Sequence, residues 1–142
     1  MGYLAGTKEK GLILACRGEM RVALYTDAAF GCHFDGKSHS GGLVTVGGAS
    51  VLEISKKQTM ITKDSTEAEL VSASDQIIYG EKCDEFMREQ GMTNMKLPLL
   101  YQDNRSTISL ITKGGGVHRN KYLRVRQNMI KEKVERKEIE VR

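Results

Sequence analysis

The segment Asp64-Ser65-Thr66-Glu67-Ala68-Glu69-Leu70 decides how the fold of this chain is interpreted. Ser65 or Thr66 can cap a helix, because either hydroxyl accepts a hydrogen bond from a free backbone N–H of the first turn. Apolar and small residues then follow at helical spacing: Val71, Ala73, Ile77 and Ile78. The pattern predicts a helix from about Ser65 to Gln90, with Gly91 as its C-terminal stop.

Two glutamates lie near the start of this predicted helix. Glu67 and Glu69 place negative charge at the positive end of the helix dipole, which is ordinary helix chemistry. They lie about 200° apart around the helix axis, so both cannot face one site. The segment alone therefore indicates a helix start that carries an acid, and both a capping and a functional role stay open.

Two aspartates elsewhere in the chain end strand-like runs. Asp27 follows Tyr25-Thr26, and Asp103 follows residues 99–102. Asp27 lies 42 residues before Glu69, and Asp103 lies 34 residues after it, so only the fold can bring the three acids together. Acids at strand ends are also common turn and cap residues, and spacing alone leaves that interpretation open.

The composition is that of a globular chain with one domain. Its 142 residues can bury a single core, and charged residues make up 28% against 39% hydrophobic residues. No window of about 18 apolar residues occurs, so the sequence excludes a membrane span. Residues 11–16 are too short and wrongly flanked for a signal peptide, which predicts an intracellular location. Three widely spaced cysteines form no C-x-x-C pair, so neither a disulfide framework nor a zinc site is indicated.

The N-terminal half predicts three successive antiparallel strands. Alternating residues over 20–26 are typical of a half-buried strand that ends before Asp27. Residues 41–46 and 50–55 are two more strand-like runs. Gly47-Gly48 joins them, and glycine tolerates the positive φ angles that a two-residue hairpin requires.

The C-terminal half predicts two further strands and two helices. A strand over 97–102 is followed by a helix that Asn104 caps and Gly114 ends. A basic helix over 119–136 comes next, and residues 138–141 begin a last strand. The order predicts an α/β fold, a mixed five-stranded sheet with three antiparallel strands first and helices packed on it.

The basic helix carries most of the excess positive charge. The whole chain has a net charge of +4, whereas residues 119–142 hold nine lysines and arginines against four glutamates. Such a face suits nucleic-acid phosphates, and Lys121, Arg124 and Arg126 are the preferred contacts. A solvated amphipathic helix with ion pairs between residues four apart explains the same pattern equally well.

Three carboxylates at one site favour a divalent cation. Mg²⁺ is a hard ion that prefers oxygen ligands and keeps waters that a phosphate can replace. Two such ions about 4 Å apart can activate water and stabilise the leaving oxygen in phosphodiester cleavage. Convergence of Asp27, Glu69 and Asp103 would therefore indicate metal-dependent hydrolysis of a phosphate ester.

Six short segments occur in a recognisable order over nearly the whole chain. They are Tyr25-Thr26-Asp27-Ala28-Ala29, Lys37-Ser38-His39-Ser40-Gly41, Ser55-Lys56-Lys57-Gln58, Ser65-Thr66-Glu67-Ala68-Glu69-Leu70, Tyr101-Gln102-Asp103-Asn104 and the run from Arg119 to Arg126. In this order they resemble the ribonuclease H domain of copia-type LTR retrotransposon polyproteins. The shared order is much more specific than any single segment.

The resemblance implies a ribonuclease H-like fold that cuts the RNA strand of an RNA:DNA hybrid. The family uses two Mg²⁺ ions, for which Mn²⁺ is a substitute. Carried over by motif, Asp27 would bridge both ions, while Glu69 and Asp103 would hold the second. The Ala-Glu-Leu position selects Glu69 rather than Glu67.

The resemblance also implies a context for the domain. Residues 3–8 resemble the connection at the end of a reverse transcriptase, so we expect 1–17 to be that connection and 18–142 to be the nuclease domain. The implied partners are an RNA:DNA hybrid and the reverse transcriptase domain of the same polyprotein. The implied location is a cytoplasmic retrotransposon particle.

The sequence departs from the family pattern at one place. The family has a fourth carboxylate on a final helix, in a segment of the type Ala-Asp-Ile-x-Thr-Lys-Pro-Leu, and the printed sequence has no such segment. We therefore expect a C-terminally truncated domain whose final helix is missing. The fourth acid completes the metal site that activates the attacking water. The alternative to an active endoribonuclease is thus a catalytically impaired nucleic-acid binding module, or a nonfunctional retrotransposon remnant.

Overall fold

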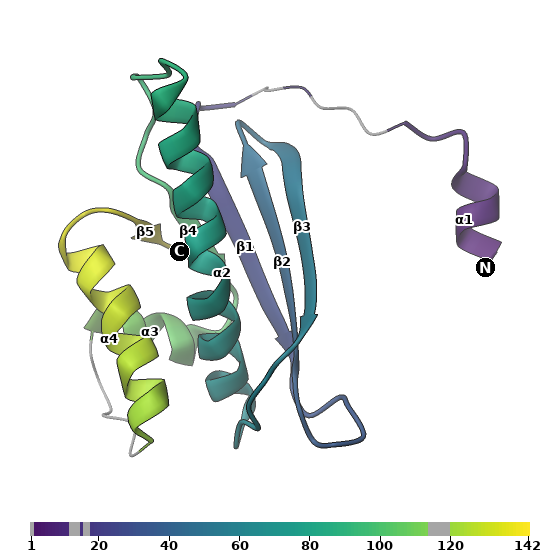
Figure 1. The fold of residues 1–142 in the computed structure, drawn as a ribbon, viewed down its shortest axis with the longest axis vertical. Helices are drawn as coiled ribbons and strands as arrows, with labels where there is room; N and C mark the ends of the chain where they lie inside the picture. The colour runs from purple at the N-terminus through teal and green to yellow at the C-terminus, as the bar shows by residue number, and fades with distance from the viewer. Residues whose placement is uncertain (1, 12–14, 16–17, 114–119) are drawn as a thin grey trace.

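The computed structural model describes residues 2–11, 15, 18–113 and 120–142. Its elements in chain order are α1 (Gly2–Thr7), β1 (Val22–Ala29), β2 (His39–Val46), β3 (Ala49–Lys57), α2 (Ser65–Glu89), β4 (Leu99–Gln102), α3 (Arg105–Lys113), α4 (Lys121–Glu135) and β5 (Glu140–Val141). Figure 1 shows α2 lying along one face of the sheet, with α3 and α4 on the same side.

The five strands form one mixed sheet in the order β3-β2-β1-β4-β5. The first three strands are antiparallel neighbours, whereas β4 runs parallel to β1, and β5 parallel to β4. Parallel neighbours need a crossover connection, and the chain between β1 and β4 includes α2, which packs on the sheet. The predicted fold class, a mixed five-stranded sheet that begins with three antiparallel strands, is confirmed.

The β2–β3 hairpin turns at the predicted glycines. Gly47 and Gly48 have φ angles of 57° and 87°, in the left-handed region that favours glycine. Both strands are longer than the sequence predicted, because pairing continues as far as His39 opposite Lys57. The hairpin therefore extends along β1 past Asp27, which lies opposite Gly41 of β2.

β1 also extends further than predicted, and this changes the position of one candidate acid. Asp27 lies inside the strand rather than after it. It pairs with Gly41 of β2, and the pairing continues to Ala29 opposite His39. The length of a strand depends on how far its partner strand extends. The local sequence of β1 holds no information about the length of β2.

α2 begins where predicted but has a different cap. Asp64, not Ser65 or Thr66, is the N-cap residue: its backbone is extended, with φ −149° and ψ 175°. Its side chain accepts a hydrogen bond from the backbone N–H of Glu67 at 2.9 Å. The helix ends at Glu89, one residue before the predicted end.

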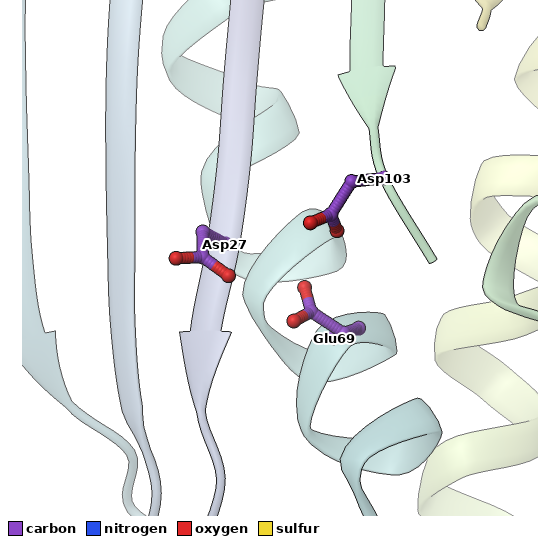
Figure 2. A group of neighbouring side chains, drawn as sticks. All are labelled: Asp27, Glu69 and Asp103. Atoms are coloured by element: carbon purple, nitrogen blue, oxygen red, sulfur yellow. The ribbon is translucent and has the colours of Figure 1, made fainter. Parts of the chain in front are cut away.

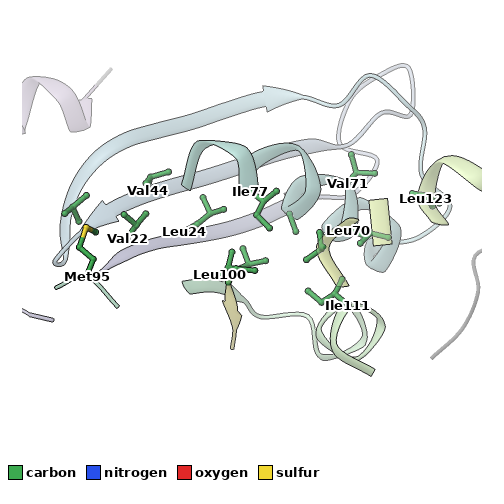
Figure 3. Close-up of a cluster of buried hydrophobic side chains, with 14 residues drawn as sticks. Val22, Leu24, Val44, Leu70, Val71, Ile77, Met95, Leu100, Ile111 and Leu123 are labelled. Atoms are coloured by element: carbon green, nitrogen blue, oxygen red, sulfur yellow. The ribbon is translucent and has the colours of Figure 1, made fainter. Parts of the chain in front are cut away.

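The core lies between α2 and the sheet and continues beneath α3 and α4 (Figure 3). Its buried side chains are Val22, Leu24, Val44, Val46, Leu70, Val71, Ala73, Ile77, Met95, Leu100, Ile111, Leu123, Ile130 and Ile139. Tyr25 alternates with Leu24 along β1 and so points to the opposite face of the sheet. There its ring stacks on that of Tyr101, with 4.6 Å between the ring centroids.

The last strand is shorter than predicted, because the turn that follows α4 takes up its first residues. Lys137 has a φ of 56°, and the backbone N–H of Glu138 donates to Lys133 O at 2.9 Å. This bond closes the C-terminus of α4. β5 consequently contains only Glu140–Val141.

Parts of the predicted architecture fall on undescribed residues. The connection expected at 1–17 lies partly there. Within it the structure describes residues 2–11 and 15, and these include the helix α1, which has no buried residue. The glycine stop at 114 and the start of the basic helix at 119 also lie outside the described residues. In the described ranges, no helix has the length and apolar character needed to cross a bilayer.

Candidate functional site

The three predicted acids lie together in the structure (Figure 2). Each of Asp27, Glu69 and Asp103 offers a carboxylate oxygen, and these oxygens all lie within 4.8 Å of one another. Asp27 and Asp103 are exposed, whereas Glu69 is buried. Within the residues that the structure describes, this is the one group of three or more potential metal ligands.

The sheet topology explains how distant residues meet here. β1 and β4 are parallel neighbours in which Thr26 lies opposite Gln102. The next residue along each chain is an aspartate, so Asp27 and Asp103 emerge side by side. Glu69 reaches them from the second turn of α2, the helix that packs against β1.

The structure separates the roles of the two glutamates near the start of α2. The carboxylate of Glu67 accepts a hydrogen bond from the backbone N–H of Lys63 at 2.8 Å, close to the start of the helix. Glu69, the residue that the family resemblance selected, is the glutamate of the acid cluster. Glu67 thus serves the helix terminus, and Glu69 is available for chemistry.

Burial sets the electrostatic character of the cluster. It raises the pKa of the Glu69 carboxyl to about 7, and the nearby negative charges of Asp27 and Asp103 add to that increase. Hydrogen bonds from Gln102 and from the backbone of Ala28 act in the opposite direction. A cation bound among the three acids would favour the ionised form of Glu69, because it offsets both burial and repulsion.

Two donors restrain the Glu69 carboxylate. The backbone N–H of Ala28 donates to Oε1 at 3.1 Å, and Gln102 Nε2 donates to Oε2 at 3.2 Å. The same Ala28 N–H also donates to Asp27 Oδ1 at 2.8 Å. Sequence reasoning missed Gln102, and its only signal there was its position next to Asp103.

A second network holds the backbone of Asp27. Ser72 Oγ donates to the carbonyl oxygen of Asp27 at 2.8 Å, and Gln76 Nε2 donates both to Ser72 Oγ at 2.8 Å and to Gly41 O at 3.0 Å. Gly42 makes room for this glutamine, since a Cβ there would lie 1.5 Å from Gln76 Oε1. Sequence reasoning did not find this network, because it depends on how α2 packs on β1 and β2.

The three predicted nucleic-acid contacts lie on α4, which packs on α2 and α3. Lys121 and Arg124 are exposed, and Lys121 Nζ lies 5.3 Å from the centroid of the Tyr122 ring. Arg126 instead donates to Ser74 Oγ and forms an ion pair with Asp75, both on α2. Binding of phosphates by these three residues stays a prediction, and Arg126 would have to give up or share its partners on α2 to take part.

The donor set of the cluster is suited to a hard divalent cation. It offers one carboxylate oxygen from each of Asp27, Glu69 and Asp103. Hard ions such as Mg²⁺ prefer oxygen ligands, whereas softer ions favour sulfur or imidazole. The chemistry of the residues present therefore fits the metal that the sequence predicted.

Neither a family model nor a curated protein matches this sequence. Solved structures do match its fold. LC11 ribonuclease H1, isolated from compost, has a TM-score of 0.60 at 18% sequence identity, over 87% of this chain and 83% of that chain. The structure of LC11 ribonuclease H1 in complex with an RNA/DNA hybrid has a TM-score of 0.56 at 16% identity, over 86% and 83% of the two chains.

A viral structure also resembles this chain. The protease-reverse transcriptase of prototype foamy virus has a TM-score of 0.51 at 13% identity, over 86% of this chain and 17% of the viral chain. At such identities these comparisons show a shared fold. The chain thus has the ribonuclease H fold, and its acid cluster lies at the edge where β1, β4 and α2 meet.

Proposed function

We propose that this chain is a metal-dependent endoribonuclease that cleaves the RNA strand of RNA:DNA hybrids. One observation carries the proposal: three carboxylates, one on β1, one on α2 and one directly after β4, bring their oxygens within 4.8 Å of one another on a ribonuclease H fold. Such a cluster is electrostatically unfavourable without a cation: burial raises the pKa of Glu69, and the charges of Asp27 and Asp103 raise it further, to about 7 in all. The fold and the donor set thus support the same chemistry.

The proposed cofactor is Mg²⁺, as two ions, with Mn²⁺ as a substitute. Asp27, Glu69 and Asp103 would together hold the metal. When bound, the metal would supply an activated water and stabilise the charge that develops on the phosphate. The exposed positions of Asp27 and Asp103 support this assignment, because both carboxylates can be reached by a phosphate group from solvent.

The surroundings of the acids also suit this role. Asp27 and Asp103 border an open hollow that Tyr25, Tyr101 and Arg142 also line. Glu69 closes the buried side of the cluster, where its two hydrogen bonds fix the direction of both oxygens. The Glu69 carboxylate is therefore oriented before a substrate arrives, which reduces the reorganisation needed in the reaction.

The hybrid substrate is supported by the likeness to LC11 ribonuclease H1, which was crystallised with an RNA/DNA hybrid. Recognition of such a duplex depends largely on backbone charge and on the RNA 2′-hydroxyls. Lys121, Arg124 and Arg126 are the proposed phosphate contacts. Lys121 and Arg124 have the exposure that this role requires.

We also propose that the domain derives from a copia-type retrotransposon polyprotein and works beside its reverse transcriptase. The ordered sequence segments support this origin, and the likeness to the foamy virus protease-reverse transcriptase is consistent with it. In this proposal residues 1–17 are the end of the reverse transcriptase connection, and 18–142 are the nuclease domain.

Cleavage of a labelled RNA:DNA hybrid in the presence of Mg²⁺ tests the proposal. We expect the wild-type chain to cut the RNA strand, and Asp103→Asn to abolish cutting while the fold stays intact. Glu85→Gln, which changes an exposed glutamate of α2 away from the cluster, is the matched control and should cut like wild type. Cutting by Asp103→Asn would show that the acids are assigned wrongly.

The alternative of a catalytically impaired binding module makes a different prediction. A wild-type chain that binds the hybrid but never cuts it, in Mg²⁺ or in Mn²⁺, would replace the endoribonuclease proposal with that alternative. A chain that neither binds nor cuts would support the remnant interpretation. A longer chain from the same reading frame, assayed in parallel, shows whether a further segment restores cutting.

A further inference from the structure

The side-chain amide of Gln102 is hydrogen-bonded to the two elements that carry Asp27 and Glu69 and to the backbone next to Asp103. Its Nε2 donates to Glu69 Oε2 on α2 at 3.2 Å and to Thr26 Oγ1 on β1 at 3.3 Å. Its Oε1 accepts from the backbone N–H of Asn104, just after β4, at 3.0 Å. Thr26 precedes Asp27 directly, so a single side chain joins the supports of all three carboxylates.

The hydrogen bonds also fix which way the amide faces. The backbone N–H of Asn104 can only donate, so the atom that it contacts must be the oxygen of Gln102. The NH₂ group therefore faces Glu69 and Thr26, and each of its two hydrogens has one acceptor. An amide rotated by 180° would place its oxygen against the Glu69 carboxylate and its NH₂ group against the backbone N–H of Asn104.

Gln102 is 5% exposed, so solvent cannot replace these bonds. Loss of the amide would leave the backbone N–H of Asn104 and the hydroxyl of Thr26 without this partner. It would also allow the Glu69 carboxylate to rotate, because the hydrogen bond from Ala28 N–H to Oε1 would then be its remaining restraint. The arrangement is thus tied to one buried side chain.

We propose that Gln102 is a positioning residue that holds the Glu69 carboxylate in the orientation needed to bind a divalent cation. Each Glu69 oxygen has one donor, Ala28 N–H or Gln102 Nε2, and keeps a lone pair that can face the other two acids. Side chains that orient metal ligands in this way contribute strongly to metal affinity. The inference rests on the proposed function, because it presumes that the acid cluster binds a cation.

Two matched substitutions separate positioning from packing. Gln102→Met keeps the length of the side chain and removes the amide. Gln127→Met makes the same change on α4. Gln127 is 3% exposed, and its side chain donates to Leu110 O on α3 at 3.0 Å. Both variants lose one buried amide, and only the first changes the surroundings of the acids.

Binding of Mn²⁺ by calorimetry and unfolding of the metal-free chain are measured for wild type and both variants. We expect Gln102→Met, which removes three hydrogen bonds, to lose at least as much stability as Gln127→Met, which removes one, and Gln102→Met alone to lose about tenfold or more in Mn²⁺ affinity. On the RNA:DNA hybrid, kcat should fall for this variant while KM changes little. If Gln102→Met does not fold, Gln102→Asn, whose amide is too short to span the three partners, takes its place with the same expectation.

The outcomes distinguish the two proposals. Wild-type Mn²⁺ affinity in Gln102→Met or Gln102→Asn, or an equal loss in Gln127→Met, would overturn the role of Gln102 and leave the nuclease proposal standing. A wild-type chain that binds Mn²⁺ but does not cut the hybrid would refute the nuclease, whereas a selective loss of affinity would still support Gln102. A wild-type chain that binds no divalent cation would overturn both.

Discussion

Asp27 and Glu69 share one hydrogen-bond donor, the backbone N–H of Ala28, which lies 2.8 Å from Asp27 Oδ1 and 3.1 Å from Glu69 Oε1. The shared donor sets the distance between an exposed acid on β1 and a buried acid on α2. It partly offsets the repulsion between the two carboxylates, and the rest must be relieved by protonation or by a cation. This balance makes the site sensitive to pH.

The affinity of the site for a divalent cation is expected to rise with pH through the neutral range. The pKa of Glu69 is raised to about 7 by burial, so below that pH a proton occupies the carboxyl group that a metal would need. Calorimetric titration with Mg²⁺ at pH 6 and at pH 8, about one unit below and about one unit above this pKa, checks the prediction. Glu69→Gln should bind more weakly and lose most of this pH dependence; a wild-type affinity that is the same at both pH values would contradict the assignment.

The metal-free chain is expected to lose stability as pH rises from about 4.5 to about 7. The pKa of Glu69 is raised from 4.5 to about 7 in the folded chain, so in this window the folded state binds a proton that the unfolded state has released. The contribution of this one group to the free energy of unfolding is on the order of 3 kcal/mol at most. Urea unfolding without metal, for wild type and Glu69→Gln, measures it: the difference in stability between the two should change with pH in this window and be constant above it.

Gly42→Ala is expected to destabilise the chain, whereas Gly41→Ala should be tolerated better. A Cβ at Gly42 would lie 1.5 Å from the side-chain oxygen of Gln76, while one at Gly41 would lie 4.0 Å from the nearest atom outside its neighbours. Gln76 is 2% exposed and hydrogen-bonded to Ser72, so it cannot simply swing away. We expect a cost of about 1–3 kcal/mol for Gly42→Ala, from overpacking and lost hydrogen bonds. Equal stabilities of the two variants in chemical unfolding would contradict this account.

Arg124→Gln is expected to weaken binding of an RNA:DNA hybrid and to lower the salt dependence of binding by about one unit of slope. Arg124 is exposed, so its charge is available to a phosphate. Arg126→Gln should also weaken binding if that side chain joins the interface, and it should cost stability as well, because Arg126 pairs with Asp75. Fluorescence anisotropy across a salt series measures both slopes. An unchanged slope for Arg124→Gln would remove this face of α4 from the interface.

Local signals were enough to predict much of the fold. The β2–β3 hairpin follows from Gly47 and Gly48, and the end of α2 follows from Gly91, which has the left-handed φ of 88°. The cap of α2 was wrong because Asp64, Ser65 and Thr66 are all good N-cap residues. Sequence preference does not say which of three such neighbours adopts the extended backbone.

The candidate site was predictable only in part. The convergence of Asp27, Glu69 and Asp103 was expected from the order of family-like segments, and the geometry agrees with it. Spacing alone could not have selected them, because the acids meet through strand pairing and helix packing. Gln102 and the Ser72–Gln76 network were missed for the same reason: their partners are distant in sequence and are defined only by the tertiary contacts.

The parallel pairing of β1 with β4 has a kinetic consequence. This pair joins residues 76 positions apart, whereas the turns of α2 and the β2–β3 hairpin join much nearer neighbours. Contacts of long sequence separation form late, since they must first overcome the entropy of closing a large loop. A refolding chain should therefore gain helix and hairpin before it gains the acid cluster. A cation that stabilises the cluster would then act mainly on the rate of unfolding and much less on the rate of folding.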